Sequence, residues 1–287
     1  MSTVRVGFVQ MAMVESREEN LGAAGKLVAE AAAQGARVVV LPELFADRYF
    51  PQRMDAARYQ LAEPIPGPVT RALEQMARDA DVTLVGGVYE RAKEGLLFNT
   101  SLLVSPRGEV LGKYRKVHIP HGPGYEEKFY FAPGDLGFPV VPAPELRVGL
   151  AICWDQWFPE TGRALGLSGA ELVVFPTAIG DEPTEPAFST HGAWQTACRA
   201  QALFNQVFVA AVNRTGREEL LSFFGGSFIC DPWGHILVEA GPDDEGAFVA
   251  DCSLDVIRKA RELFHFYRDR RPDAYGPIAG MSGERPG

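Results

Sequence analysis

Three polar residues each follow or end an apolar run, at points where buried strands are expected to end. Glu43 comes directly after VVVLP, Lys116 lies in GKYRKVHIP, and Cys153 ends the run LRVGLAIC. A cysteine thiolate is a nucleophile, and a carboxylate can take a proton from a thiol and return it to a leaving amine. Together with an ammonium group, these residue types would suit nucleophilic cleavage of a bond between carbon and nitrogen.

The expected position of these residues brings them together. In open α/β sheets, side chains at the carboxyl ends of the strands converge on one crevice. Side-chain directions alternate along KYRK, which predicts that Lys116 faces inward. Because Cys153 precedes a helix start and would lie close to an ammonium, we expect its pKa to be depressed and its thiolate to be favoured.

Each of these residues also has a structural interpretation when it is taken alone. A cysteine after an apolar strand is most often a packed core residue, and a lysine in a KYRK run is usually solvated. A glutamate after a proline can cap a helix or pair with an arginine. Their occurrence at three strand ends favours the joint, chemical interpretation.

Seven valine-rich runs predict the strands that position these residues, at 4–10, 36–42, 82–89, 98–105, 146–153, 171–176 and 206–213. Helices are predicted between several of them, at 16–34, 69–80, 159–167 and 191–204, the first opened by the capping-box pair Ser16 and Glu19. Strand and helix therefore alternate in the first half of the chain. From residue 222 onward, short segments joined by turns predict antiparallel strands.

The organisation predicted from this pattern is an α/β fold with mixed sheets and helices on the outer faces. Residues 1–287 are expected to form a single domain, with 268–287 as a C-terminal tail. That tail is rich in Arg, Gly and Pro. It either wraps a surface or a neighbouring subunit, or it is disordered.

Composition restricts the possible partners. The chain has 287 residues, of which 46% are hydrophobic, and its net charge is −9. The negative charge opposes binding to nucleic acid or to an anionic membrane. No signal sequence and no apolar run of membrane-spanning length is recognisable, so a soluble, cytoplasmic protein is expected.

The cysteines and histidines carry further information about compartment and cofactors. The four cysteines are far apart and lie in apolar segments, which indicates reduced thiols rather than disulfides. The five histidines show no short metal-ligand spacing. We therefore predict no metal and no other cofactor.

The contexts of the three polar residues resemble the nitrilase superfamily of carbon–nitrogen hydrolases. The similarity covers almost the whole chain, with LPE at Glu43, a KxHIP-type segment at Lys116 and a strand-ending Cys153. It implies a triad of Glu43 as general base, Lys116 as oxyanion stabiliser and Cys153 as nucleophile. Glu127, in YEEKFYF, matches a second glutamate that many members use to orient the lysine and the substrate. The resemblance also implies a four-layer αββα sandwich and a homo-oligomer, either a dimer or a multiple of dimers.

Within the superfamily, HIPHGPGYEEKFYFAPGDLGF, CWDQWFPE and FPTAIGDEP look most like the amidohydrolases that cleave N-carbamoylputrescine to putrescine, carbon dioxide and ammonia. Members that act on N-carbamoyl amino acids carry arginines shortly after the cysteine, where this chain has Gln156 and Trp157. A carboxylated substrate would lose its ion-pair partner there. Glu182 aligns with an acidic position of the carbamoylputrescine pattern, between Asp181 and Glu185.

The predicted substrate is therefore a small, cationic N-carbamoyl amine. Glu182 is expected to bind its ammonium group, and Tyr49 and Trp154 are expected to line an aliphatic channel. A solvated acidic loop and two core aromatic residues are the alternative interpretations. Other possible functions are hydrolysis of an N-carbamoyl amino acid, an ω-amide or a nitrile, or ligand binding without catalysis on the same fold. A papain-like protease is disfavoured because its Cys-Gly-x-Cys-Trp flank is missing around Cys153.

Overall fold

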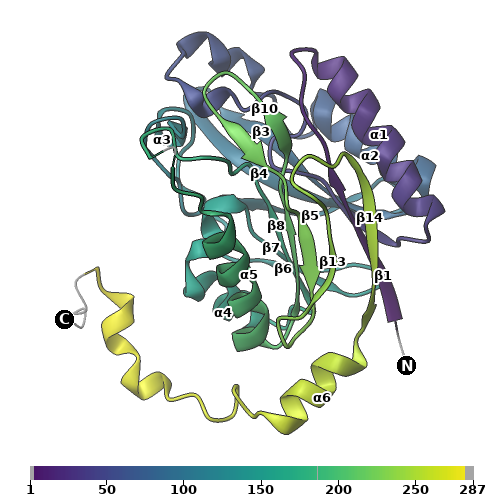
Figure 1. The fold of residues 1–287 in the computed structure, drawn as a ribbon, viewed down its shortest axis with the longest axis vertical. Coiled ribbons are helices and arrows are strands. Elements are labelled where there is room, and N and C mark those ends of the chain that lie inside the picture. The colour runs from purple at the N-terminus through teal and green to yellow at the C-terminus, as the bar shows by residue number, and fades with distance from the viewer. Residues whose placement is uncertain (1–2, 186, 282–287) are drawn as a thin grey trace.

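Two six-stranded sheets form the centre of the molecule in a computed structural model that describes residues 3–185 and 187–281 (Figure 1). The first sheet has the order β14-β1-β2-β3-β4-β5 and the second has the order β13-β12-β9-β8-β7-β6. The first comprises β1 (Thr3–Gln10), β2 (Val38–Val40), β3 (Thr83–Lys93), β4 (Leu96–Val104), β5 (Val110–Arg115) and β14 (Gly246–Ser253). The second comprises β6 (Val140–Pro142), β7 (Arg147–Leu150), β8 (Leu172–Pro176), β9 (Phe208–Val212), β12 (Phe228–Cys230) and β13 (Ile236–Glu239).

Helices cover the outer face of each sheet. Helices α1 (Arg17–Ala33) and α2 (Pro68–Ala80) pack on the first sheet, burying apolar residues such as Val28 and Leu73. Helices α4 (Pro159–Leu167) and α5 (His191–Asn205) lie over the second sheet, on the other side of the molecule (Figure 1). The inner faces of the two sheets share one apolar core, in which Phe8 and Val40 of the first sheet join Val148 and Phe208 of the second. The predicted four-layer αββα sandwich is confirmed.

Local sequence signals explain several element boundaries. Helix α1 begins after Ser16, whose Oγ accepts the Glu19 N–H at 3.3 Å, as the capping pair predicts. Helix α4 begins with Pro159, a residue whose fixed φ suits the first helical position. The seven predicted runs correspond to strands β1, β2, β3, β4, β7, β8 and β9.

The predicted alternation of strand and helix fails between residues 83 and 115. There β3, β4 and β5 pair consecutively in antiparallel fashion, with no helix between them. Gly95 and Gly108, with φ of +73° and +74°, lie in the two short turns that connect these strands. Turns of that length are sufficient only for hairpins, because parallel strands need a long crossover.

The remaining elements lie at the edges of this sandwich. A small hairpin forms from β10 (Thr215–Arg217) and β11 (Ser222–Phe224), and α3 (Glu127–Tyr130) is a single turn. Short 3-10 helices form at η1 (Phe50–Gln52), η2 (Ala56–Leu61), η4 (Pro272–Ala274) and η5 (Gly276–Ala279). Helix α6 (Asp255–Leu263) lies at the end of the sandwich (Figure 1), where its Ile257 joins the core and Gln206 Nε2 donates to the Ala260 carbonyl oxygen at 2.8 Å. The predicted tail is described as far as residue 281, and 282–287 lie outside the described residues.

In the part of the chain that the structure describes, no helix combines the length and the apolar character that crossing a bilayer requires.

Candidate active site

Cys153 occupies a strained turn at the end of β7. It opens the 3-10 helix η3 (Cys153–Trp157) with φ of +45°, an uncommon value for a residue other than glycine. The fully buried Asp155 holds this turn, because its Oδ2 accepts the Ile152 N–H at 2.9 Å and the Tyr114 hydroxyl at 2.8 Å. Its Oδ1 accepts the His118 N–H at 3.1 Å. The cysteine turn is thereby tied to the end of β5, where Lys116 lies.

Glu43 is buried just beyond the end of β2. Its Oε1 accepts hydrogen bonds from Lys116 Nζ and from Asn99 Nδ2, both at 2.7 Å. Its Oε2 is also buried and has no hydrogen-bond partner among the described residues. One oxygen of this carboxylate is therefore held in place while the other is free to accept a proton.

Lys116 lies between two carboxylates and is completely buried. Its Nζ donates to Glu43 Oε1 at 2.7 Å and to Glu127 Oε1 and Oε2 at 2.9 and 2.7 Å. Glu127 lies in α3, and its Oε1 also accepts the Tyr49 hydroxyl at 2.7 Å. We call Glu43, Lys116, Glu127 and Cys153 the catalytic cluster, after the role that the sequence predicts for them. With two carboxylates and one ammonium, it has an excess of negative charge.

This charge balance reverses the expected pKa shift of the cysteine. Burial raises the pKa of Cys153 well above its ordinary value, and the charges of Glu43 and Glu127 raise it further while Lys116 lowers it. The prediction of a depressed pKa is therefore wrong, since it counted the nearby ammonium but neither the burial of the thiol nor the two carboxylates. The resting group is a thiol, which must lose its proton to a base as it attacks.

Glu127 is itself shifted toward the protonated form. Burial raises the pKa of Glu127 from its ordinary 4.5 to about 7, with Lys116 opposing this shift and Glu43 adding to it. The carboxyl therefore titrates near neutral pH, which is where a group that transfers or gates protons is most useful.

The predicted substrate-binding residues have three different environments. Tyr49 is fully buried, and its hydroxyl is bound to Glu127. Trp154 is 39% exposed and lies edge-on to Trp157 at 6.4 Å between ring centroids, so it is not a core residue. Glu182 is half-buried in the loop after β8, where burial and the neighbouring Asp181 raise its pKa.

Tyr125 is a residue of this region that the sequence did not single out. Its hydroxyl accepts the Gly180 N–H at 3.0 Å and donates to the Asp181 carbonyl oxygen at 3.2 Å. Burial raises its pKa, and the charges of both Glu182 and Cys153 contribute to that shift. Tyr125 therefore lies near the nucleophile and near the acidic loop. Tyr125 lies two residues before Glu127 in YEEK. This closeness in sequence to a predicted site residue was the signal that could have identified it.

Gln156, for which the predicted alternative was an arginine, turns its amide oxygen into the protein. It is buried, and its Oε1 accepts the Trp194 indole N–H at 2.8 Å and the Thr177 hydroxyl at 3.2 Å. These contacts direct the amide toward α5. Position 156 therefore offers no guanidinium to pair with a substrate carboxylate.

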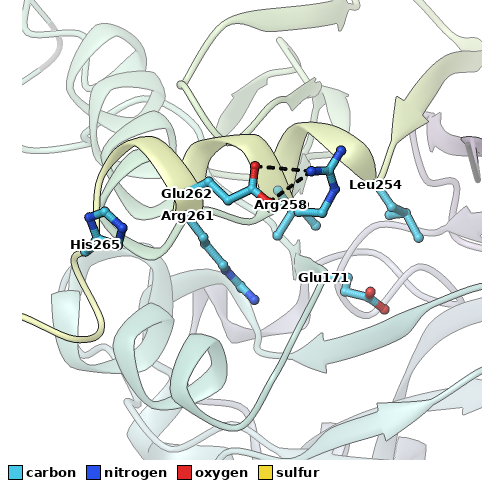
Figure 2. Close-up of a pocket in the computed structure, with 7 residues that line it drawn as sticks. Glu171, Leu254, Arg258, Arg261, Glu262 and His265 are labelled. Atoms are coloured by element: carbon cyan, nitrogen blue, oxygen red, sulfur yellow. Dashed lines mark hydrogen bonds and ion pairs between the residues drawn. The ribbon is translucent and has the colours of Figure 1, made fainter.

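A surface pocket beneath α6 is separate from the catalytic cluster (Figure 2). Arg258 and Glu262 on its rim pair with each other at 2.9 and 3.1 Å. It is lined by Glu171, Leu254, Ile257, Arg258, Arg261, Glu262 and His265. None of these is a cysteine or a serine, so the pocket has no nucleophile of the kind found at residue 153. In residues 3–185 and 187–281, no group of three or more His, Cys, Asp or Glu side chains is placed to hold a metal ion.

The fold and the cluster together define a class of enzyme, and comparison with known proteins gives its family. Residues 5–262 match the family model described as carbon-nitrogen hydrolase. The chain therefore belongs to the carbon–nitrogen hydrolase family. The predicted resemblance to the superfamily is confirmed, as is the predicted enzyme class, a hydrolase of carbon–nitrogen bonds.

Three relatives show how far this similarity extends. An N-carbamoylputrescine amidase of Oryza sativa subsp. japonica is 39% identical over 293 residues, covering 99% of this chain and 97% of that protein. A citrullinase of Francisella tularensis subsp. tularensis is 34% identical over 97% of this chain and 99% of its own length. The crystal structure of a carbon-nitrogen hydrolase from Helicobacter pylori G27 superposes with a TM-score of 0.93 and 32% identity, covering 97% of this chain and 99% of that one. The nitrilase type of the sandwich is thus confirmed.

Proposed function

We propose that this enzyme hydrolyses the ureido group of N-carbamoylputrescine, giving putrescine, carbon dioxide and ammonia. The observation that carries the proposal is the environment of Glu182. This half-buried carboxylate makes no ion pair within the described residues, and it follows Asp181, whose carbonyl oxygen accepts the Tyr125 hydroxyl at 3.2 Å. The charges of Glu182 and Cys153 both act on Tyr125. An ammonium group at the far end of a substrate would neutralise it. The full-length similarity to an N-carbamoylputrescine amidase supports the same choice.

The first half of the reaction would form a covalent adduct on Cys153. As its sulfur attacks the ureido carbon, the thiol proton moves to Glu43, whose Oε2 is free to accept it. Lys116 Nζ and the backbone N–H of Trp154 stabilise the oxyanion that develops. Glu43 then gives its proton to the departing nitrogen, and the carbon–nitrogen bond breaks to leave a thiocarbamate.

The second half of the reaction would release the enzyme. Glu43 takes a proton from water, and the resulting hydroxide attacks the thiocarbamate carbon. The carbon–sulfur bond then breaks. The sulfur regains a proton, and the carbamic acid that leaves decomposes to carbon dioxide and an amine or ammonia. Glu127 and Tyr49 would hold Lys116 in place through both halves.

A substrate panel tests the proposal. Ammonia release would be measured with N-carbamoylputrescine, N-carbamoyl-β-alanine, an N-carbamoyl-D-amino acid and citrulline, with Cys153→Ala as the blank. We expect the highest kcat/KM for N-carbamoylputrescine, because it is the one that presents an ammonium without a carboxylate. A higher kcat/KM for any carboxylated substrate would reject the proposed substrate while leaving the cysteine chemistry in place.

Citrulline is the second candidate substrate, because of the similarity to a citrullinase. It has the same ureido group, but its far end carries both an ammonium and a carboxylate. Gln156 is a neutral amide whose oxygen accepts the Trp194 indole N–H, so it supplies no ion-pair partner for that carboxylate. This disfavours citrulline relative to the purely cationic substrate.

Assembly and location complete the proposal. We infer a homo-oligomer built from dimers, since closed two-fold assemblies are the most common, and light scattering would measure its mass. We also infer a cytoplasmic location, which agrees with four free cysteines. The expectation that the enzyme needs no cofactor and binds neither nucleic acid nor membrane remains a prediction, as does the single domain with its 268–287 tail.

A further inference from the structure

Two buried, charged residues outside the catalytic cluster contact the backbone that carries Glu43 and Tyr49. We propose that Arg214 and Glu218 form a positioning pair, which fixes the general base directly and fixes Glu127 through Tyr49. The inference rests on the proposed function only in assuming that Cys153 and Glu43 carry out the chemistry. Neither residue touches the reacting atoms in this account.

Arg214 supplies hydrogen bonds to the turn that begins at Glu43. The side chain is completely buried just after β9, and its Nη2 donates to the carbonyl oxygens of Glu43 at 2.6 Å and Leu44 at 3.2 Å. Its Nη1 donates to the Asp47 carbonyl oxygen at 3.3 Å. Leu44 has φ of +49°, a conformation that a side-chain-bearing residue seldom adopts unless its surroundings enforce it. The guanidinium is the group that enforces it.

Glu218 completes the clamp from the other side of the same guanidinium. Its Oε1 accepts Arg214 Nη1 at 2.8 Å, and its Oε2 accepts the Tyr49 N–H at 2.7 Å and Gln52 Nε2 at 3.1 Å. The Arg214 guanidinium also lies over the Tyr49 ring, 5.8 Å from its centroid. Because the Tyr49 hydroxyl donates to Glu127, this pair acts on both carboxylates that hold Lys116.

The pair also links the base to the predicted ammonium site. Glu218 belongs to the turn of the β10–β11 hairpin, and Ser222 in β11 is bound to the loop that carries Glu182. The Asp181 N–H donates to the Ser222 carbonyl oxygen at 2.9 Å, and the Ser222 N–H donates to Asp181 Oδ1 at 3.0 Å. One hairpin thus sets the position of the segment containing the base and of the acidic loop.

A lysine could not replace this arginine. The planar guanidinium donates in fixed directions to several acceptors at once, whereas an ammonium is a single compact charge. Arg214→Lys should therefore keep the charge and lose the placement of Glu43. We expect kcat to fall about 10²-fold with KM within about threefold of wild type, because misplacing a reacting group by about 1 Å costs on that order.

The test compares Arg214→Lys, Arg214→Ala and Glu218→Gln with Arg17→Lys as a matched control. Arg17 also bridges a carboxylate, Asp47, and a backbone carbonyl, that of Leu61, but it does not contact the Glu43 or Leu44 backbone. Arg17→Lys should lower the melting temperature and leave kcat unchanged. Millimolar guanidinium should raise the kcat of Arg214→Ala at least about tenfold, and it should leave the kcat of Arg17→Lys unchanged.

A second readout works without any substrate. The rate of Cys153 alkylation by iodoacetamide at pH 7 would be measured for wild type, Glu43→Gln and Arg214→Lys. We expect slower alkylation of Cys153 in Arg214→Lys than in wild type, because Glu43 keeps its charge but is no longer placed to accept the thiol proton. Glu43→Gln differs from both, because it also removes a charge that raises the pKa of Cys153. Wild-type alkylation and kcat in Arg214→Lys would overturn the proposal, as would an equal loss of kcat in Arg17→Lys. If Arg214→Ala does not fold, Arg214→Lys and Glu218→Gln decide the question. A wild-type protein inactive on the whole substrate panel would reject the proposed function, yet the alkylation comparison would still test this pair.

Discussion

Strand β5 and the residue after it contribute to two charged clusters with opposite balances. The catalytic cluster has two carboxylates around one ammonium. The second cluster, which we call the Glu90 cluster, has one carboxylate that accepts Lys113 Nζ at 2.7 Å, Arg115 Nη2 at 2.7 Å and the Thr100 hydroxyl at 2.7 Å. Two cations therefore contact this one buried carboxylate, and Arg115 Nη1 also pairs with the exposed Asp135 at 2.8 Å.

The two balances give opposite pKa shifts from the same kind of burial. Burial alone would raise the pKa of Glu90, but hydrogen bonds from Arg115 and Lys113 lower it to about 2. Burial raises the pKa of Glu127, and the charge of Glu43 adds to this rise while the ammonium of Lys116 opposes it. The resulting pKa is about 7. The Glu90 cluster therefore stabilises an ionised carboxylate, whereas the catalytic cluster brings the pKa of one carboxyl, Glu127, close to neutral pH. The comparison teaches that the ratio of charges, rather than burial itself, separates a structural cluster from a reactive one.

The largest expected effect is the loss of the nucleophile. Cys153→Ala should lower kcat at least about 10⁴-fold, because the substitution removes the atom that forms the covalent adduct. Ammonia release and the melting temperature would be measured together. Cys252→Ala removes a buried thiol in β14 that is outside the catalytic cluster, and it should keep wild-type kcat. Appreciable turnover by Cys153→Ala would reject the assignment.

The next effect concerns Lys116, the one cation among residues 3–185 and 187–281 that contacts the carboxylates of both Glu43 and Glu127. Lys116→Ala should lower kcat by at least about 10²–10³, the usual cost of losing an oxyanion donor, and more because Glu43 and Glu127 would then lack their shared partner. Lys113→Ala, three residues earlier in β5, should change kcat little. Near-wild-type kcat in Lys116→Ala would mean that the ammonium is structural.

Exchanging one carboxyl for an amide in each cluster tests the comparison itself. Glu127→Gln should lower kcat about 10²-fold by releasing Lys116 from its position. Glu90→Gln should instead lower the free energy of unfolding by about 1–3 kcal/mol, because Arg115 and Lys113 lose an ionised acceptor, and it should keep kcat. Urea denaturation at pH 8 and steady-state kinetics would be compared. The same effects from both substitutions would show that the clusters do not differ in role.

The pH dependence should reveal the raised pKa of Glu127. We expect kcat/KM to rise with pH through about 7, as the carboxyl ionises and can bind Lys116. The folded-state pKa exceeds the ordinary 4.5, so folding favours the protonated form. Its contribution to the free energy of unfolding is therefore complete below pH 4.5 and is lost as pH rises through about 7. The difference in that free energy between wild type and Glu127→Gln should decline over this range, and a flat difference would contradict the shift.

The smallest effect is expected at the acidic loop. Glu182→Gln should raise KM for N-carbamoylputrescine up to about tenfold, since a half-exposed ion pair is partly screened by solvent. It should leave kcat nearly unchanged. Glu185→Gln is the control, because Glu185 is exposed on the same loop. Equal KM values for Glu182→Gln and wild type would remove Glu182 from substrate recognition.

Most of the architecture could be predicted because it depends on local patterns. The valine-rich runs predicted seven strands, and Pro159 and Ser16 marked helix starts that the structure contains. The meander between residues 83 and 115 was missed because antiparallel and parallel pairing have the same apolar pattern. What differs is the length of the connection, and the turns at Gly95 and Gly108 were the signal that went unused.

The candidate site was only partly predictable, because its chemistry depends on distances between chain segments. Strand-end positions were enough to group Glu43, Lys116 and Cys153. The direction of the Cys153 pKa shift could not be predicted in this way, since it depends on how deeply the thiol is buried and on how many carboxylates surround one ammonium. Arg214 and Tyr125 were missed because each contacts a segment far away in the sequence. Arg214 binds the backbone of residues 43–47, and Tyr125 binds that of residues 180–181, and no short motif reports such contacts.

The most direct test of the central claim, that Cys153 is the reacting group of the catalytic cluster, is selective alkylation followed by peptide mass mapping. The folded protein would be treated with limiting iodoacetamide at pH 7, and the label on each of the four buried cysteines would be compared with residual turnover. We predict that the first equivalent labels Cys153, that turnover falls in proportion, and that N-carbamoylputrescine slows the labelling. Turnover that persists after Cys153 is fully alkylated, or that falls with the labelling of Cys198, Cys230 or Cys252 instead, would contradict the claim.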